Sequence, residues 1–386
     1  MGNLTEDTAF QSNIPESADM IVAVVYSIFG ICSLFGNSLL LHISYKKKDL
    51  LKPAEFFIIN LAVSDLGLTV SLYPLAITSS IFHRWLYGKI ICLIYAFCGV
   101  LFGICSLTTL TLLSTVCCLK VCYPLYGNRF SYGHGRLLIA CAWAYALVFA
   151  CSPLARWGVY GPEPYGTACC IDWRSSNTQA VAKSYTVVLF VFCYLLPCGV
   201  IVASYAQILA AVRRSRRAVK RHVSPQSKLS NFQAIIVKLS VAVCIGFFAA
   251  WSPYAVVSMW AAFGHIENIP PLAFALPAMF AKSSTLYNPI IYLMFRPYFR
   301  KVMCREFAML QQACLRNCFC TERLVKCSSA SIVKEEASVE QKQTPKMQQA
   351  AKKSVRVFVR GKRNAEIDCL EITLEAVPAR VKTAWR

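Results

Sequence analysis

Residues 270–294 read PPLAFALPAMFAKSSTLYNPIIYLM, a stretch long enough to cross a membrane although it contains Lys282. A helix rises about 1.5 Å per residue, so roughly 20 apolar residues cross a hydrocarbon core of about 30 Å. Backbone polar groups in lipid must be satisfied within their own segment, so we expect an all-α bundle of seven transmembrane helices. Hydropathy predicts the spans at about 20–45, 54–82, 90–120, 136–156, 183–212, 232–262 and 270–294.

The composition agrees with a membrane bundle. Hydrophobic residues make up 56% of the 386 residues, above the roughly 45–50% of soluble proteins. Prolines inside membrane helices kink them rather than break them. We expect such kinks at Pro74, Pro153, Pro197, Pro253 and Pro289.

The net charge of +21 is distributed unevenly between the two sides of the membrane. Basic clusters follow the first span (Lys46, Lys47, Lys48) and the fifth (Arg213, Arg214), and the tail is rich in Lys and Arg. This bias predicts a multi-pass protein of the plasma membrane with an extracellular N-terminus. Basic residues beside spans also favour contact with anionic lipids of the bilayer, and their placement argues against nucleic acid as a partner.

The pattern divides the chain into four predicted regions. They are an extracellular leader (1–19), the transmembrane domain (20–295), a short amphipathic helix on the inner membrane surface with a cysteine cluster (296–320) and a disordered cytoplasmic tail (321–386). In the leader, Asn3 begins a glycosylation sequon. Cysteines beside the inner surface are candidates for palmitoylation, with plain reduced thiols as the alternative: Cys304, Cys314, Cys318 and Cys320.

Two charged residues lie deep inside predicted spans. A charge at mid-membrane costs about 2.5–3.5 kcal/mol, so each one requires a role. Asp65 has Asn37 and Asn288 as natural partners, in either a structural network or a hydrated switch. Lys282 lies twelve residues into the last span. Its amine can lose its proton and condense with an aldehyde, or it can pair with a carboxylate as a structural lysine.

Motifs within residues 20–300 resemble those of rhodopsin-class G-protein-coupled receptors: Gly36-Asn37, Asn60-Leu61-Ala62-Val63-Ser64-Asp65, Trp143, Pro197, Phe247, Trp251-Ser252-Pro253-Tyr254 and Asn288-Pro289-Ile290-Ile291-Tyr292. Within this class, a lysine seven residues before Pro289 resembles the retinal-binding lysine of opsins, and here it is Lys282. Three further segments are similar to the neuropsin (opsin-5) group and suggest a neuropsin-like paralogue: Leu50-Leu51-Lys52-Pro53-Ala54-Glu55, His83-Arg84-Trp85 and Pro162-Glu163-Pro164-Tyr165-Gly166-Thr167.

The resemblance implies a photoreceptor, not an enzyme, that holds 11-cis or all-trans retinal as a Schiff base on Lys282. A protonated Schiff base in a dry pocket needs an anion. The position used by vertebrate visual opsins is Tyr95, which is neutral. The resemblance implies a second counterion position in the outer loop, six residues before its cysteine, and here that position is Glu163. Tyr95 is then expected as a hydrogen-bond partner; an exposed Glu163 beside an unprotonated Schiff base is the alternative. The pocket is expected to be lined by Trp251, Tyr254 and Ile171.

Family alignment implies a disulfide between Cys92 and Cys169, which would tie the third helix to the loop over the pocket. The adjacent Cys170 remains free. It is either an inert small hydrophobe or a thiol that adds reversibly to the retinal chain. Such a thiol adduct would shorten the conjugation and bleach visible absorption.

The inner end of the third helix departs from the family. Val116-Cys117-Cys118 replaces the acidic residue, arginine and aromatic residue expected there, whereas Tyr205 and Tyr292 are retained. Without the arginine, opening of the inner end is easier but contact with a heterotrimeric G protein is weaker.

The resemblance still implies a heterotrimeric G protein as partner, with arrestin and a receptor kinase acting on the tail. A retinal photoisomerase and a ligand-gated receptor without chromophore are the alternatives. No metal site is expected.

Overall fold

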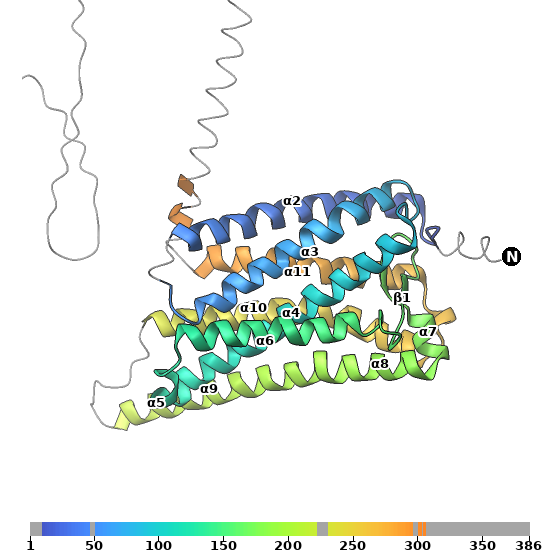
Figure 1. The fold of residues 1–386 in the computed structure, drawn as a ribbon. Helices are drawn as coiled ribbons and strands as arrows, with labels where there is room; N and C mark the ends of the chain where they lie inside the picture. The colour runs from blue at the N-terminus through green and yellow to red at the C-terminus, as the bar shows by residue number, and fades with distance from the viewer. Residues whose placement is uncertain (1–9, 47–50, 222–230, 296–299, 303, 306–386) are drawn as a thin grey trace, which may run out of the picture. The chain divides into compact units, whose positions relative to one another are not determined.

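The computed structural model describes residues 10–46, 51–221, 231–295, 300–302 and 304–305, and only the backbone of residues 215–221 and 231–233. Within these residues the chain forms a bundle of seven long helices (Figure 1), as the sequence predicts. They are α2 (Glu16–Lys46), α3 (Glu55–Ile81), α4 (Gly88–Cys122), α6 (Tyr132–Cys151), a fifth helix made of α8 (Ala180–Phe190), η2 (Val191–Leu195) and α9 (Leu196–Arg221), α10 (Asn231–Phe263) and α11 (Pro271–Phe295).

Short elements connect the long helices. The hairpin of β1 and β2 and the helix α7 lie at the end of the bundle where α2 begins, and α5 lies at the opposite end (Figure 1). We refer to these as the outer and the inner end. The short elements are α5 (Pro124–Gly127), β1 (Tyr160–Pro162), β2 (Cys169–Ile171), α7 (Trp173–Thr178) and η3 (Ile266–Asn268).

Helix α4 lies at the centre of the bundle, where it packs against α3, α6, α9, α10 and both strands. The surfaces that face away from the bundle are apolar as well, with exposed Ile31, Val70, Ile90, Leu137 and Val202. Soluble monomers rarely expose large contiguous apolar patches. The apolar exterior therefore agrees with a bundle whose solvent is lipid.

The seventh helix is the least apolar of the long helices. Within the described residues, six helices are long and apolar enough to cross a membrane by length and composition, and α11 falls short of that measure. It carries Lys282 and Asn288 together with prolines at 277 and 289. The polar groups that give this helix its proposed role therefore also lower its hydropathy.

Two spans differ from the sequence-based expectation. The fourth helix runs from Tyr132 to Cys151 rather than over 136–156, because Ser131 caps its start by accepting a hydrogen bond from the His134 backbone. The expected kink at Pro153 is wrong, since that residue lies in the turn after the helix. In the fifth helix a π-helical segment, η2, precedes Pro197. Proline lacks an N–H donor, so the carbonyl four residues earlier has no α-helical partner, and the wider turn relieves this mismatch.

The other predicted prolines lie inside helices, Pro74 in α3, Pro253 in α10 and Pro289 in α11. Of the predicted membrane-surface helix, residues 300–302 and 304–305 are described and helical, with Cys304 exposed. The predicted glycosylation site Asn3 and the palmitoylation candidates Cys314, Cys318 and Cys320 lie outside the described residues. The predicted tail (321–386) lies outside them as well.

Candidate functional site

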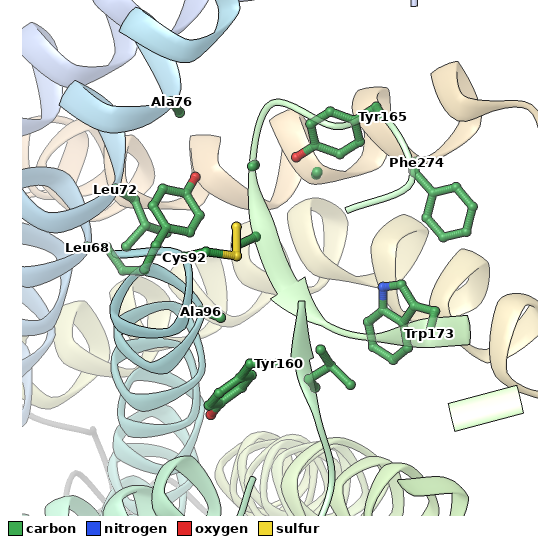
Figure 2. Packing of buried hydrophobic residues seen from close by; sticks show 14 of the residues in the cluster. Leu68, Leu72, Ala76, Cys92, Ala96, Tyr160, Tyr165, Trp173 and Phe274 are labelled. Carbon is green, nitrogen blue, oxygen red and sulfur yellow. A yellow bond between two sulfur atoms is a disulfide. The ribbon is translucent and has the colours of Figure 1, made fainter. Parts of the chain in front are cut away.

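A disulfide-anchored hairpin covers the outer end of the bundle. Strands β1 and β2 pair antiparallel, with Gly161 opposite Cys170 and Pro162 opposite Cys169. Cys169 is bonded to Cys92 near the start of α4, with the two Cα atoms 5.4 Å apart. Figure 2 shows this disulfide between the hairpin and the helix that carries Cys92. The hairpin is therefore held on the central helix as a lid.

The turn of the hairpin carries Glu163. Its backbone N–H donates to Ala168 (2.8 Å), and its carbonyl accepts from the N–H of Gly166 (2.9 Å). Gly166 has φ +89°, a left-handed conformation that glycine adopts without steric cost. The turn holds Glu163 inward, and only 4% of this residue is exposed. The alternative of an exposed loop acid is therefore wrong.

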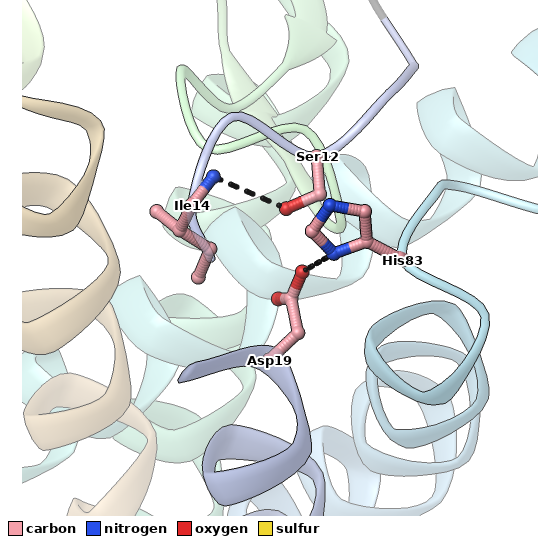
Figure 3. A network of polar contacts seen from close by, with 4 residues as sticks. All are labelled: Ser12, Ile14, Asp19 and His83. Atoms are coloured by element: carbon pink, nitrogen blue, oxygen red, sulfur yellow. Dashed lines mark hydrogen bonds and ion pairs between the residues drawn. The ribbon is translucent and has the colours of Figure 1, made fainter. Parts of the chain in front are cut away.

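A segment before α2 crosses the outer end and holds the lid in place. The backbone of Ser12 donates to the His83 carbonyl (3.1 Å), and Asn13 donates to the carbonyls of Tyr165 (3.2 Å) and Pro164 (2.9 Å). Just after this segment, Asp19 in the first turn of α2 places its Oδ2 2.6 Å from Nδ1 of His83 (Figure 3). These contacts close the bundle above the hairpin.

Beneath the lid lies an apolar cavity, and every predicted chromophore residue reaches it. Lys282 and Glu163 are the charged residues of its described lining, and Tyr73, Tyr95, Tyr194, Tyr254, Ser258 and Thr285 contribute hydroxyl groups. Further residues that line it include Cys170, Ile171, Phe190, Phe247, Trp251 and Tyr254. A cavity with a mainly apolar surface and a small number of charged residues is typical of a site for a small apolar ligand.

Lys282 lies among tyrosines rather than beside a carboxylate. Its Nζ lies 5.5 Å from the centre of the Tyr26 ring and 6.0 Å from that of Tyr95. Tyr73 donates its hydroxyl to the Lys282 carbonyl (2.8 Å), which fixes this turn of α11. Among the described residues, no carboxylate oxygen lies within 4.0 Å of Nζ. The amine is thus held by aromatic contacts and has no ion-pair partner in direct contact.

Glu163 is the acid that faces the same cavity. Its Oε1 accepts a hydrogen bond from Tyr254 (2.6 Å), and its Oε2 has no partner among the described residues. Burial raises the pKa of the Glu163 carboxyl, although the hydrogen bond from Tyr254 and the positive charge of Lys282 oppose this effect. The hydroxyl of Tyr95 is likewise buried without a described partner. Two polar atoms therefore remain available to a charged group in the cavity.

Cys170 faces the hydroxyl of Tyr254, which also bonds to Glu163. Its Sγ lies 2.8 Å from the hydroxyl of Tyr254. Burial raises the pKa of the Cys170 thiol, and the nearby Glu163 carboxylate raises it further. The thiol is therefore neutral at rest and lies at the cavity wall, within reach of a ligand.

Trp251 forms the inner wall of the cavity. It stacks on Phe247, with ring centres 5.6 Å apart, and its Nε1 donates to Ser284 (3.1 Å). Gly103 leaves room for it, since a Cβ at that position would lie 3.3 Å from the indole. Trp251 thus links α4, α10 and α11 at the base of the cavity.

A polar network lies further toward the inner end. Asn288 donates to Asp65 Oδ2 (2.6 Å), as predicted. Asn37 does not bond to Asp65 and instead donates to the Thr285 carbonyl (2.9 Å), because the proline at 289 leaves that carbonyl without an N–H partner in α11. Both asparagines therefore stabilise the region before Pro289.

At the inner end, the described hydrogen bonds between α9 and α10 join neutral groups. Val116, Cys117 and Cys118 are all buried. Tyr205 of α9 is hydrogen-bonded to Ser240 of α10 and lies 3.8 Å from Cys244. Tyr292, also predicted as a switch residue, is buried in the same half of the bundle.

Comparison with known proteins decides the family. The model for the 7 transmembrane receptor (rhodopsin family) matches residues 36–292. The chain belongs to this family. It is 39% identical to opsin-5 of Mus musculus over 289 residues, which cover 75% of this chain and 77% of that protein. It is therefore a multi-pass membrane receptor of the opsin type, similar to the opsin-5 group.

Other rhodopsin-family members are similar over the same length. The visual pigment-like receptor peropsin of Homo sapiens is 33% identical over 292 residues, 74% of this chain and 84% of that protein. The crystal structure of squid rhodopsin superimposes with a TM-score of 0.71 at 28% identity, covering 78% of this chain and 84% of the squid chain. The seven-helix fold and the opsin-type relationship thus rest on agreement of sequence and structure.

Sequence reasoning missed several residues around Lys282 and the lid. Tyr26 and Tyr73 surround the amine from α2 and α3, and Trp173 packs against Tyr254 with ring centres 6.3 Å apart. No motif marks these aromatic residues, because aromatic side chains are common throughout membrane helices. Their role follows only from contacts between helices that are far apart in the sequence.

Proposed function

We propose that this protein is a light-sensing receptor that binds retinal covalently at Lys282. The observation that carries the proposal is a lysine without a carboxylate in direct contact, in a lidded apolar cavity whose only acid is Glu163. The unpartnered Oε2 of Glu163 and hydroxyl of Tyr95 fit a ligand that brings a positive charge into this cavity. An aromatic wall and an apolar lining suit a long polyene.

When bound, retinal supplies a conjugated chain that isomerises in light and, through its aldehyde, a Schiff-base link whose charged nitrogen is that of Lys282. Glu163 acts as the counterion, and Tyr95 donates a hydrogen bond near it. The disulfide between Cys92 and Cys169 holds the lid and keeps water out. In such a dry cavity Glu163 is the group that compensates a buried positive charge.

The inner wall would pass the signal on. Trp251 contacts the cavity, and Pro253 lies inside the same helix two residues later. We expect a displacement of Trp251 to pivot α10 at this proline and to open the inner end. The partner at the inner end would be a heterotrimeric G protein. The receptor would lie in the plasma membrane with its N-terminus on the extracellular side. Arrestin and a receptor kinase would act on the tail.

Cys170 would supply a second chemistry at the same site. Its sulfur lies at the cavity wall and can add reversibly to the conjugated chain, which would abolish visible absorption without releasing the ligand. A Cys170→Ala variant is expected to keep its visible photochemistry and to lose any ultraviolet-absorbing photoproduct.

The test is to express the receptor, add 11-cis or all-trans retinal, and record absorption spectra in the dark and after illumination. A band beyond that of free retinal, lost in Lys282→Ala, is the expected result. Absence of any such band with either isomer would contradict the proposal, as would an unchanged light response in Lys282→Ala.

A retinal photoisomerase is the second candidate. It is favoured by the inner end, where Cys117 stands in place of the family's arginine and the described contacts between α9 and α10 are neutral. It predicts release of isomerised retinal and no light-dependent nucleotide exchange on any G protein. Light-dependent exchange with retained retinal would instead support the receptor.

A further inference from the structure

Three groups of the lid and of α10 form a continuous hydrogen-bonded chain. Cys170 Sγ lies 2.8 Å from Tyr254 Oη, and Tyr254 Oη lies 2.6 Å from Glu163 Oε1. The chain runs along the cavity wall, since all three residues line it. It connects the only thiol of the lid that is not in a disulfide with the only carboxylate of the cavity.

The direction of the two bonds follows from proton counting. Tyr254 has one O–H proton, and it donates this proton to the Glu163 carboxylate. Its oxygen can then only accept from Cys170, so the S–H proton points at Tyr254 Oη. The protons are therefore aligned for transfer from sulfur to Tyr254 and from Tyr254 to Glu163.

The hairpin register produces this alignment. Neighbouring side chains in a strand point to opposite faces. Cys169 bonds to Cys92 on the α4 side, so Cys170, the next residue of β2, is directed to the opposite side and meets Tyr254. The family disulfide thus fixes the orientation of the second cysteine.

The Cys170 thiol needs a base, reached here through Tyr254, to take its proton when the sulfur reacts. Burial and the nearby carboxylate raise the pKa of the Cys170 thiol, and burial raises the pKa of Glu163 as well. A free thiolate is thus disfavoured in this cavity, whereas the Glu163 carboxylate accepts a proton more readily than an ordinary glutamate. The first effect disfavours a preformed thiolate and the second makes Glu163 a better proton acceptor, so the proton is expected to leave the sulfur only as the new bond forms.

We infer that Tyr254 and Glu163 form a proton relay that takes the proton from Cys170 Sγ as the sulfur bonds to the ligand and returns it when that bond breaks. The inference rests on the proposed function, in which Lys282 holds retinal and Cys170 adds to it. It assigns Glu163 a second role beside that of counterion and makes Tyr254 the group that connects the two.

The step balances in atoms and charge. Cys170 Sγ supplies the electron pair of a new sulfur–carbon bond, and the displaced π electrons move along the conjugated chain to the nitrogen of Lys282. The Sγ proton passes to Tyr254 Oη, whose own proton passes to Glu163 Oε1. The positive charge at Lys282 and the negative charge at Glu163 disappear together. Removal of a buried ion pair avoids its desolvation cost, which favours the step in this cavity.

The first experiment follows the ultraviolet photoproduct in retinal-loaded receptor. Tyr254→Phe keeps the ring and removes the relay hydroxyl, so formation and dark decay of the photoproduct should slow by about 10²-fold, the low end of general acid–base effects. A solvent isotope effect in the parent receptor should disappear in this variant. Tyr87→Phe is the matched control, since its hydroxyl bonds to Thr78 outside the cavity (2.6 Å).

The second experiment uses receptor without retinal. A small maleimide is added, and its attachment to each cysteine is followed by mass spectrometry. Attachment to Cys170 should slow at least about tenfold in Tyr254→Phe and in Glu163→Gln, with no further loss in the double variant, because both changes interrupt one relay. Cys193, which also lines the cavity, serves as the internal reference for reagent access.

The outcomes separate the relay from the proposed function. If Cys170→Ala leaves the photoproduct unchanged, addition of sulfur fails and the relay with it. If Cys170→Ala abolishes the photoproduct while Tyr254→Phe changes neither its rates nor the maleimide rate, addition stands and the relay is overturned. If no pigment forms, the proposed function fails. Equal maleimide rates at Cys170 in parent and Tyr254→Phe receptors would overturn the relay in that case too.

Discussion

The outer and inner halves of the bundle hold their helices together by different chemistry. The outer half carries a disulfide, a buried acid and a half-buried lysine around one cavity. At the inner end, the described link between α9 and α10 consists of the neutral groups of Tyr205, Ser240 and Cys244. In the proposed function, the outer residues hold the chromophore, the inner residues control opening, and Trp251 connects the two.

The largest effect is expected from removing the only acid of the outer cavity. Glu163→Gln leaves a positive nitrogen at Lys282 without an anion, so the nitrogen should lose its proton at neutral pH and visible absorption should move to the ultraviolet. Acidification should restore the visible band, because added protons charge the nitrogen again. Absorption spectra over a pH series measure this effect.

The matched control is Glu267→Gln, which changes an exposed acid at the same end of the bundle. It should leave the spectrum unchanged. A visible band at neutral pH in Glu163→Gln would show that another group acts as the counterion.

The next effect concerns the lid. Cys92→Ala removes the disulfide to Cys169 and should lower the free energy of unfolding by about 2–5 kcal/mol, together with pigment yield. Thermal unfolding of purified receptor measures the change in stability. The ratio of pigment absorbance to protein absorbance measures the pigment yield. Cys141→Ala, at an exposed free cysteine, should change neither. Equal stability of Cys92→Ala and the parent would contradict a structural role of the lid.

The smallest effect is expected at the inner end. Ser240→Ala removes one hydrogen bond to Tyr205, worth about 0.5–1.5 kcal/mol, so opening in the dark should become roughly 2–10 times more frequent. The rate at which a thiol reagent modifies the buried Cys118, in the same part of α4, reports this opening. Ser27→Ala, whose hydroxyl bonds within its own helix, is the control. An unchanged rate would mean that the neutral contacts do not hold the inner end closed.

The contrast between the two halves also explains what the sequence could predict. Hydropathy predicted seven spans, although α11 is less apolar than the other six and the fourth helix has different bounds, and the pairing of Cys92 with Cys169 follows from the family alignment. Family motifs also brought Lys282, Glu163 and Trp251 to one cavity before any contact was known. These features depend on local composition or on fixed positions within a known family.

Other features depend on contacts between distant segments and could not be predicted. Tyr73 bonds to the Lys282 carbonyl across 209 positions of sequence. The bond of Asn37 to Thr285 depends on the carbonyl that Pro289 leaves free, and the position of Cys170 against Tyr254 depends on the register of a two-stranded hairpin. Sequence periodicity does not contain these distances, so only the packed structure reveals them.

Reductive trapping tests the central claim most directly. Receptor incubated with retinal in the dark is treated with borohydride, which converts a Schiff base into a stable amine, and its peptides are analysed by mass spectrometry. We predict a retinyl group on the peptide that contains Lys282 and none in Lys282→Ala. A receptor with no retinyl group on this peptide, or with the group spread over other lysines, would contradict the account.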